Sequence, residues 1–243
     1  MFSKKVFSIF AAFVLLIAAS MSVAAMNGAA TDKGADKARV EVPLNLAILV
    51  QDDLVSQVGN ELKATSEFIR SLPTGSRVMV AYITVGSLQV RQPFTDDLDK
   101  AAKSLRLPAG NTAVSPYNPY VEVIQALRRF ENGGTNRNAL LLISDGLDTS
   151  RGFDAGAAGN TMDLLRAVKE AQKRNVAIYS FFAPSAGLTS WNSRAVIYGQ
   201  SSLNRLSNET GGRAFFQGSS FVTFKPYFDR LRQTLNDQYA KAY

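Results

Sequence analysis

Short, continuous apolar runs alternate along this chain with longer stretches whose apolar residues recur at helical spacing. The runs at 44–50, 77–85, 88–94, 138–144, 176–182 and 213–217 predict six strands. Between them, helical spacing predicts a helix that ends before Pro73, one capped by Thr95 and Asp96, and one that begins at Pro119. Three more helices are predicted around Met162–Ala171, around Leu203 and Leu206 up to Gly211, and from Phe221 to Leu235.

The order of these elements predicts the fold class. Strands that are apolar along their whole length are typical of parallel sheets covered on both faces, and the alternation with helices agrees. Gly86 and Ser87 form a tight turn between two strands, which predicts a hairpin. We therefore expect an α/β domain over residues 42–243: a doubly wound, mostly parallel six-stranded sheet with one antiparallel edge strand and helices on both faces.

The first 41 residues follow a different pattern. Lys4 and Lys5 precede an uncharged apolar run, and small residues follow at 22–25. This arrangement is typical of a secretory signal peptide, which we expect to span residues 1–25. Residues 26–41 are small and charged without apolar periodicity, which predicts a flexible leader. The protein is therefore expected to be exported, to the periplasm or out of the cell.

Composition narrows the chemistry that the domain can carry. The chain of 243 residues contains no Cys and no His, which excludes disulfides, thiolate nucleophiles, His bases and His- or Cys-ligated metals. Any metal site must use oxygen ligands, which suit Mg²⁺, Ca²⁺ or Mn²⁺. The formal charge of +7 is spread among acids and forms no basic run, so we expect no nucleic-acid partner.

Acidic residues follow two of the most apolar strands. Asp52 and Asp53 end the first, and Asp145 and Asp148 end the strand at 138–144. If these strands are neighbours, the four carboxylates converge at the sheet edge where open α/β sheets bind ligands. Two interpretations stay open: an oxygen-lined divalent metal site, or solvated acids that cap the following helices.

The sequence resembles the von Willebrand factor A-type domain, and more narrowly the von Willebrand factor A-related proteins exported by acidobacteria and similar bacteria. The matching stretches span most of residues 44–218 and keep the family's order. They are LAILVQDDLVSQVGNEL, FTDDLDKAAKSLRLPAG, SPYNPYVEVIQAL, LLLISDGLD and SSLNRLSNETGGRAFFQG.

The resemblance implies a metal-ion-dependent adhesion site at the same sheet edge. Carried over by position, its Mg²⁺ ligands are Asp52, Ser56, Asp145 and a loop Thr at Thr112, for which Ser115 could stand in. The first Ser of the family's D-x-S-x-S motif is replaced by Leu54, which cannot coordinate a metal. Accessory ligands could come from the acids next to these positions, Asp53 and Asp148.

These observations predict an exported, non-catalytic binding module that engages another protein or a cell-surface component through this degenerate site. Two alternatives stay open: a metal-dependent hydrolase with Asp53 or Asp148 as its base, and a metal-free structural protein of the cell envelope. The polar and aromatic loop at 108–119 fits either ligand contact or turn chemistry. We expect Trp191, the only tryptophan, to pack against the core.

Overall fold

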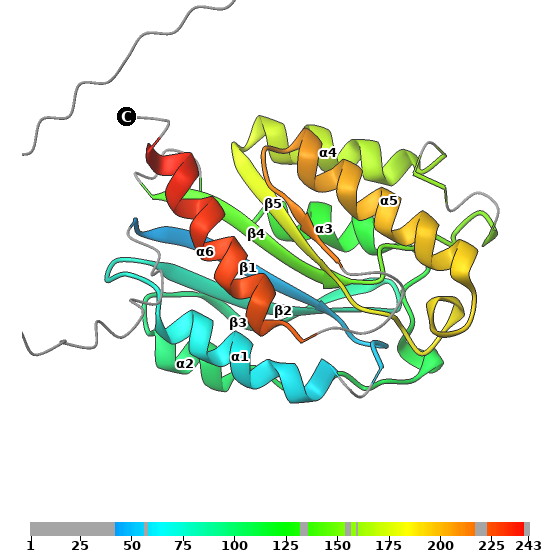
Figure 1. The fold of residues 1–243 in the computed structure, drawn as a ribbon, viewed down its shortest axis with the longest axis horizontal. Coiled ribbons are helices and arrows are strands. Elements are labelled where there is room, and N and C mark those ends of the chain that lie inside the picture. Colours follow the sequence, from blue (N-terminus) through cyan, green and yellow to red (C-terminus); the bar gives the residue numbers. More distant parts are fainter. Residues whose placement is uncertain are drawn as a thin grey trace, which may run out of the picture. The chain divides into compact units, whose positions relative to one another are not determined.

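The computed structural model describes residues 42–55, 58–131, 136–153, 157–158, 160–216 and 223–240 (Figure 1). The expected signal peptide and leader lie outside these residues, as does Ser56. The strands are β1 (Leu44–Gln51), β2 (Arg77–Thr84), β3 (Ser87–Thr95), β4 (Arg137–Ser144), β5 (Val176–Phe182) and β6 (Ala214–Phe215). The helices are α1 (Val58–Arg70), α2 (Leu98–Lys103), α3 (Pro119–Leu127), α4 (Met162–Lys173), α5 (Ser193–Glu209) and α6 (Lys225–Ala240), with short 3₁₀ turns η1 (Thr112–Val114) and η3 (Leu188–Ser190).

The six strands form one sheet in the order β3-β2-β1-β4-β5-β6. All neighbours pair in parallel except β2 and β3, which form the expected antiparallel hairpin at one edge. The order reverses direction at β1, which lies between β2 and β4. The predicted fold class is therefore confirmed, and β1 and β4 are neighbours, so the acids that follow both strands meet at one edge.

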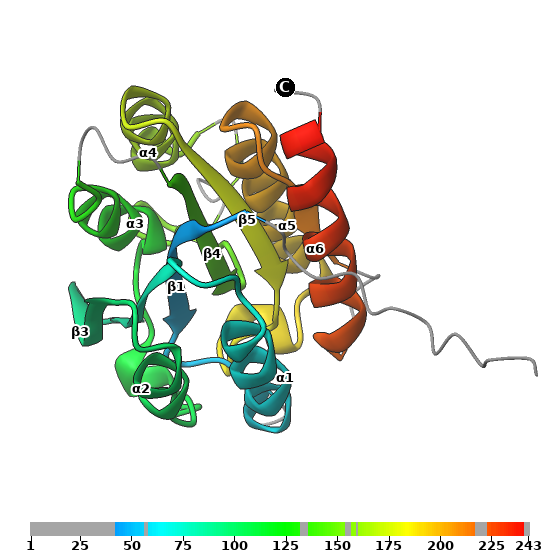
Figure 2. The same cartoon turned by 90° about the vertical axis from the view of Figure 1, so that its left-hand side faces the viewer.

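Helices cover both faces of the sheet, and each face has its own apolar core (Figure 2). On one face, α1, α2 and α6 pack against alternate strand residues that include Leu46, Ile48 and Val50 of β1. On the other face, α3, α4 and α5 pack against the intervening residues, such as Ala47 and Leu49. Because β1 is apolar on both sides, its alternation is invisible in the sequence.

Three details differ from the sequence-based expectations. Asp97, not Thr95 or Asp96, caps α2, because its carboxylate accepts a hydrogen bond from the N–H of Lys100 at 2.9 Å. Helix α5 begins at Ser193, because Asn192 caps it by accepting from the N–H groups of Arg194 and Ala195. Trp191 does not pack in the core but is 72% exposed.

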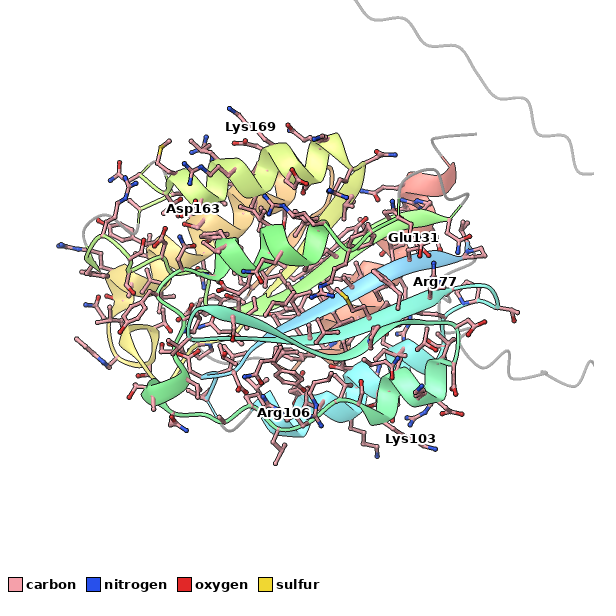
Figure 3. The ribbon with its side chains drawn as sticks, turned by 180° about the vertical axis from the view of Figure 1, so that it is seen from behind. Arg77, Lys103, Arg106, Glu131, Asp163 and Lys169 are labelled. Atoms are coloured by element: carbon pink, nitrogen blue, oxygen red, sulfur yellow. The ribbon has the colours of Figure 1, made fainter. Side chains whose placement is uncertain are left out.

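We use the name rim for the edge of the sheet where β1, β2, β4 and β5 end, together with the connections that follow them and the first turns of α3, α4 and α5. It lies on the right-hand side of Figure 1. Figure 3 shows the molecule from behind, with Asp163 of α4 near the rim and Arg77 and Glu131 at the opposite edge. Within the part of the chain that the structure describes, no helix is long and apolar enough to span a bilayer.

Candidate functional site at the rim

The end of β1 divides its polar side chains between the two faces of the sheet. Because successive side chains of a strand point to opposite sides, Gln51 and Asp53 share one side and Asp52 takes the other. The contacts agree: Gln51 Nε2 donates to Asp53 Oδ1 at 2.7 Å. Asp52 is bonded instead to Arg106, beyond α2. The two adjacent carboxylates therefore have different surroundings.

Asp52 is held in a bidentate ion pair. Arg106 donates from both terminal nitrogens to the two carboxylate oxygens, at 2.6 and 2.8 Å, and the N–H of Ala109 adds a bond of 3.0 Å. The guanidinium lies over the Tyr82 ring, 4.0 Å from its centroid, and the Tyr82 hydroxyl bonds to both backbone groups of Arg106. The bond to Asp52 raises the pKa of Arg106. Asp52 is thus neutralised within the protein, and it holds the loop that leads to η1.

Asp53 is fully buried, and none of the cationic side chains that the structure describes bonds it. Its carboxylate accepts hydrogen bonds from Gln51 and from the Ser115 hydroxyl. Burial, followed by repulsion from the negative charge of Asp145, raises the pKa of Asp53 from 3.8 to about 6. Of the two loop residues that the sequence offered, Thr112 and Ser115, Ser115 is therefore the one that contacts an acid of this site.

Asp145 follows β4 and lies on the same side as Asp53. Its Oδ2 accepts from the Thr189 hydroxyl at 3.0 Å, and its Oδ1 accepts from the N–H of Leu147 at 3.1 Å. Burial raises the pKa of this carboxyl. Gln51 links the two acids, because its Oε1 accepts from the N–H of Asp145 while its Nε2 donates to Asp53.

A small pocket opens beside these acids, with a volume of about 140 Å³. Loops from three parts of the chain meet here, since each follows a strand or helix that ends at the rim. Its lining residues are Gln51, Ser115, Pro116, Asp145, Leu147, Thr149, Ser185, Gly187 and Leu188.

The remaining residues of the sequence-derived metal set lie elsewhere. Thr112 is exposed in η1, and Asp52 is engaged by Arg106. Leu54 is buried and forms an isolated β-bridge with Ser185. Asp148 accepts from the N–H and hydroxyl of Ser150, at 3.0 and 2.6 Å, and so closes its own loop. Of the predicted ligands and accessory residues, the structure brings together Asp145, Asp53 and Ser115.

Two glycines let α5 approach the Asp145 loop. A Cβ on Gly199 would lie 1.9 Å from the carbonyl oxygen of Asp145, so no other residue fits there without displacing the loop. Gly146 has a φ of +68°, which favours glycine, and its own Cβ would lie 2.6 Å from the carbonyl oxygen of Gly199. The backbone position of Asp145 is therefore fixed by direct contact with a helix.

Carboxylate and hydroxyl oxygens are the donors that Mg²⁺ and Ca²⁺ prefer, and Asp53, Asp145 and Ser115 carry such oxygens. Asp53 and Asp145 repel each other in a buried setting, and a cation between them would relieve that repulsion. Mg²⁺ is commonly bound through one or two carboxylates and keeps several waters. Across the described residues, no group of three or more Asp and Glu side chains is placed to hold a metal ion. Any such site therefore depends on two carboxylates, with Ser115 as a neutral ligand.

Sequence reasoning missed Gln51, Arg106, Ser185 and Thr189. The sequence does contain a signal for Gln51, because it is the first polar residue after an uninterrupted apolar run and so marks the end of the strand. Arg106 and Thr189 lie 54 and 44 residues from the acids they bond, so nothing local points to them.

Solved structures with a similar fold were found, whereas no protein-family model and no curated protein sequence matches the chain. An aerotolerance-related membrane protein from Bacteroides fragilis NCTC 9343, carrying multiple mutations to serines, aligns with a TM-score of 0.55 and 13% identity. The alignment covers 80% of this chain and 99% of that chain. The conserved hypothetical protein BatB from Bacteroides thetaiotaomicron gives 0.55 and 14% over 82% and 99%. The VWA domain of SpRpn10 gives 0.47 and 14% over 81% and 95%.

The strand order, the antiparallel edge strand and the two likenesses with TM-scores of 0.55 together define a doubly wound α/β fold. The resemblance read from the sequence is confirmed at the level of the fold. At 13–14% identity, the solved structures carry no information on ligand, metal or location.

Proposed function

We propose that this protein is an exported, non-catalytic binding module that engages a protein or cell-surface ligand at the rim, assisted by a divalent cation. The observation that carries the proposal is the pair of buried carboxylates, Asp53 and Asp145, beside an open pocket. Burying two acids side by side without a cationic partner is costly, and binding sites are where proteins retain such arrangements.

The residues of this chain divide the work of binding. Asp53 and Asp145 would hold Mg²⁺, with Mn²⁺ or Ca²⁺ as substitutes, and Ser115 would add a neutral oxygen. Bound there, the cation would supply a positive charge, and an acidic group of the ligand could complete its coordination. Gln51 and Thr189 orient the two carboxylates through the hydrogen bonds described above. The N-terminal pattern at 1–25 supports export.

Calorimetric titration of the leaderless protein with MgCl₂, MnCl₂ and CaCl₂ tests the cation. We expect binding by the wild type and its loss in Asp53→Asn and Asp145→Asn. Asp148→Asn is the matched control, because this acid lies at the rim but bonds only its own loop. Absence of heat with every ion would refute the role of the cation.

Asp52→Asn separates the structure-based ligand set from the sequence-derived one. We expect this variant to retain metal binding, since Asp52 bonds Arg106 on the other side of β1. Loss of binding in Asp52→Asn with retention in Asp53→Asn would favour the sequence-derived set.

The hydrolase alternative is tested on the same proteins. Turnover of p-nitrophenyl phosphate or p-nitrophenyl acetate that depends on metal and disappears in Asp145→Asn would overturn the non-catalytic proposal. A folded protein that binds no metal and no ligand at the rim would instead favour the structural role in the envelope.

A further inference from the structure

Exposed apolar side chains gather at one end of this molecule. Among the described residues, seven large apolar side chains are exposed, and every one lies on a rim connection or in the first turns of the helix that follows it. At the opposite edge, none of the described residues is of this kind. We call these seven the apolar rim residues: Val85, Leu107, Tyr117, Val121, Met162, Trp191 and Ile197.

The two aromatic members are each bonded through their backbone to a residue that lines the pocket. Tyr117 follows Pro116, which lines the pocket, and its carbonyl oxygen accepts from the N–H of Thr149, another lining residue, at 2.8 Å. Trp191 donates its N–H to the carbonyl oxygen of Leu188, a third lining residue, at 3.3 Å. Tyr117 is 67% exposed and Trp191 is 72% exposed. Exposed Trp and Tyr beside a concave polar centre are typical anchors of protein interfaces.

Around these residues, the exposed charged side chains that are not already paired, within the described ranges, are positive. Arg151 and Arg194 are exposed on the rim connections. Among the described residues, the acids nearby are buried or already bonded: Asp163 accepts from Arg166 and Asn118, for example. A second copy of this chain would bring the same arginines face to face in a twofold interface, which disfavours self-association. A lipid surface would cover the polar pocket without satisfying its hydrogen-bonding groups, which is costly.

We propose that the rim is a docking surface for a protein segment that presents an acidic side chain between aromatic or aliphatic ones. Trp191 and Tyr117 anchor the apolar residues, and Arg151 and Arg194 attract the acid. This inference rests on the proposed function in placing the ligand at the rim, but it names the partner's chemistry and does not require the cation.

Selection from a phage-displayed library of random twelve-residue peptides on the immobilised leaderless protein tests the surface. We expect the enriched peptides to combine Asp or Glu with Trp, Phe, Leu or Ile. Their affinity, measured with synthetic peptides, should fall about tenfold or more in Trp191→Ala and less in Trp191→Phe. It should also fall in Arg194→Glu but not in Lys173→Glu, which reverses an exposed charge at the far end of α4.

Several outcomes would overturn the proposal: enrichment of basic peptides, an affinity unchanged by Trp191→Ala, or no enrichment at all. Sedimentation with vesicles of phosphatidylcholine and phosphatidylglycerol that is lost in Trp191→Ala would assign the surface to lipid. Self-association in sedimentation velocity that is lost in the same variant would assign it to a second copy.

Repeating the peptide titrations in EDTA separates this inference from the proposed function. Peptide binding that persists in EDTA and depends on Trp191 supports the docking surface even if no cation binds. Cation binding without any Trp191-dependent peptide leaves the proposed function standing and refutes the docking surface.

Discussion

Asp52 and Asp53 are adjacent in the sequence, yet the protein treats their charges in opposite ways. Asp52 is paired with Arg106 on the α1 and α2 side of the sheet, where it holds a loop. Asp53 is buried on the α3 to α5 side near another acid, and no cationic side chain of the described residues bonds it. The first arrangement stabilises the fold, whereas the second is costly, because burial and repulsion from Asp145 both disfavour the charged form of Asp53. The difference arises because successive side chains of a strand point to opposite faces of the sheet.

The largest effect is expected from removing the Arg106 guanidinium, which pairs with Asp52. Arg106→Met leaves Asp52 buried without its partner and should lower the free energy of unfolding by about 3 kcal/mol. Urea denaturation measures this change. Arg70→Met is the control, because its ion pair with Asp99 is exposed and should contribute far less. Equal losses in the two variants would contradict the role assigned to Asp52.

The double variant Asp52→Asn with Arg106→Met refines the same comparison. It removes both charges, so part of the stability lost in Arg106→Met should return. No recovery would mean that the cost comes from the packing of Arg106 on Tyr82.

On the other side of β1, a substitution is expected to raise the free energy of unfolding. Without metal at pH 8, Asp53→Asn should raise the free energy of unfolding by about 2 kcal/mol, because it removes a buried charge that repels Asp145. The Gln51 amide can still donate to the new side chain. Urea denaturation in EDTA measures the gain, and a loss of stability would show that Asp53 is a structural acid like Asp52.

The pH dependence follows from the pKa of Asp53. Its folded value of about 6 exceeds its ordinary value of 3.8, so the folded state binds the proton more tightly between these values. This contribution to stability is therefore fully present below about pH 4 and is lost as the pH rises through about 6. Asp53→Asn should flatten the decline over that window, and an equally steep decline in the variant would assign it to other groups.

The smallest effect is expected at Thr189, which supports Asp145. Thr189→Val removes the hydroxyl that donates to Asp145 and accepts from the N–H of Ser185. The expected loss in the free energy of unfolding is about 1 kcal/mol, with weaker binding of any cation. Thr234→Val, in which an exposed hydroxyl bonds only its own helix, is a suitable control. A loss as large as that of Arg106→Met would mean that Thr189 does more than orient a ligand.

Most of the fold could be predicted from the sequence. Strands apolar on both faces, the hairpin turn at Gly86 and the helical spacing led to the observed sheet and to most element bounds within a few residues. Helix α5 was the exception, since its first turns are largely polar or exposed and lack an apolar period.

The site could be predicted only in outline. The convergence of acids at one edge followed from parallel strands, and Asp145 and Ser115 were among the candidates. Which of Asp52 and Asp53 lies on the same side of β1 as Asp145 could not be predicted from the sequence, because β1 is buried on both sides and offers no polar alternation to fix the register. The motif spacing selected Asp52, which bonds Arg106, whereas the neighbouring Asp53 is the acid that Gln51 links to Asp145.

The close approach of α5 to the Asp145 loop has a consequence for mutational tolerance. Every substitution at Gly199 adds a Cβ where the carbonyl oxygen of Asp145 already lies. In a library of all single substitutions selected for folding, this position should accept nothing but glycine, while exposed Trp191, only eight positions earlier, should accept nearly everything. Selection for ligand capture would then restrict Trp191 as well, so that the two screens together would distinguish what the fold requires from what binding requires.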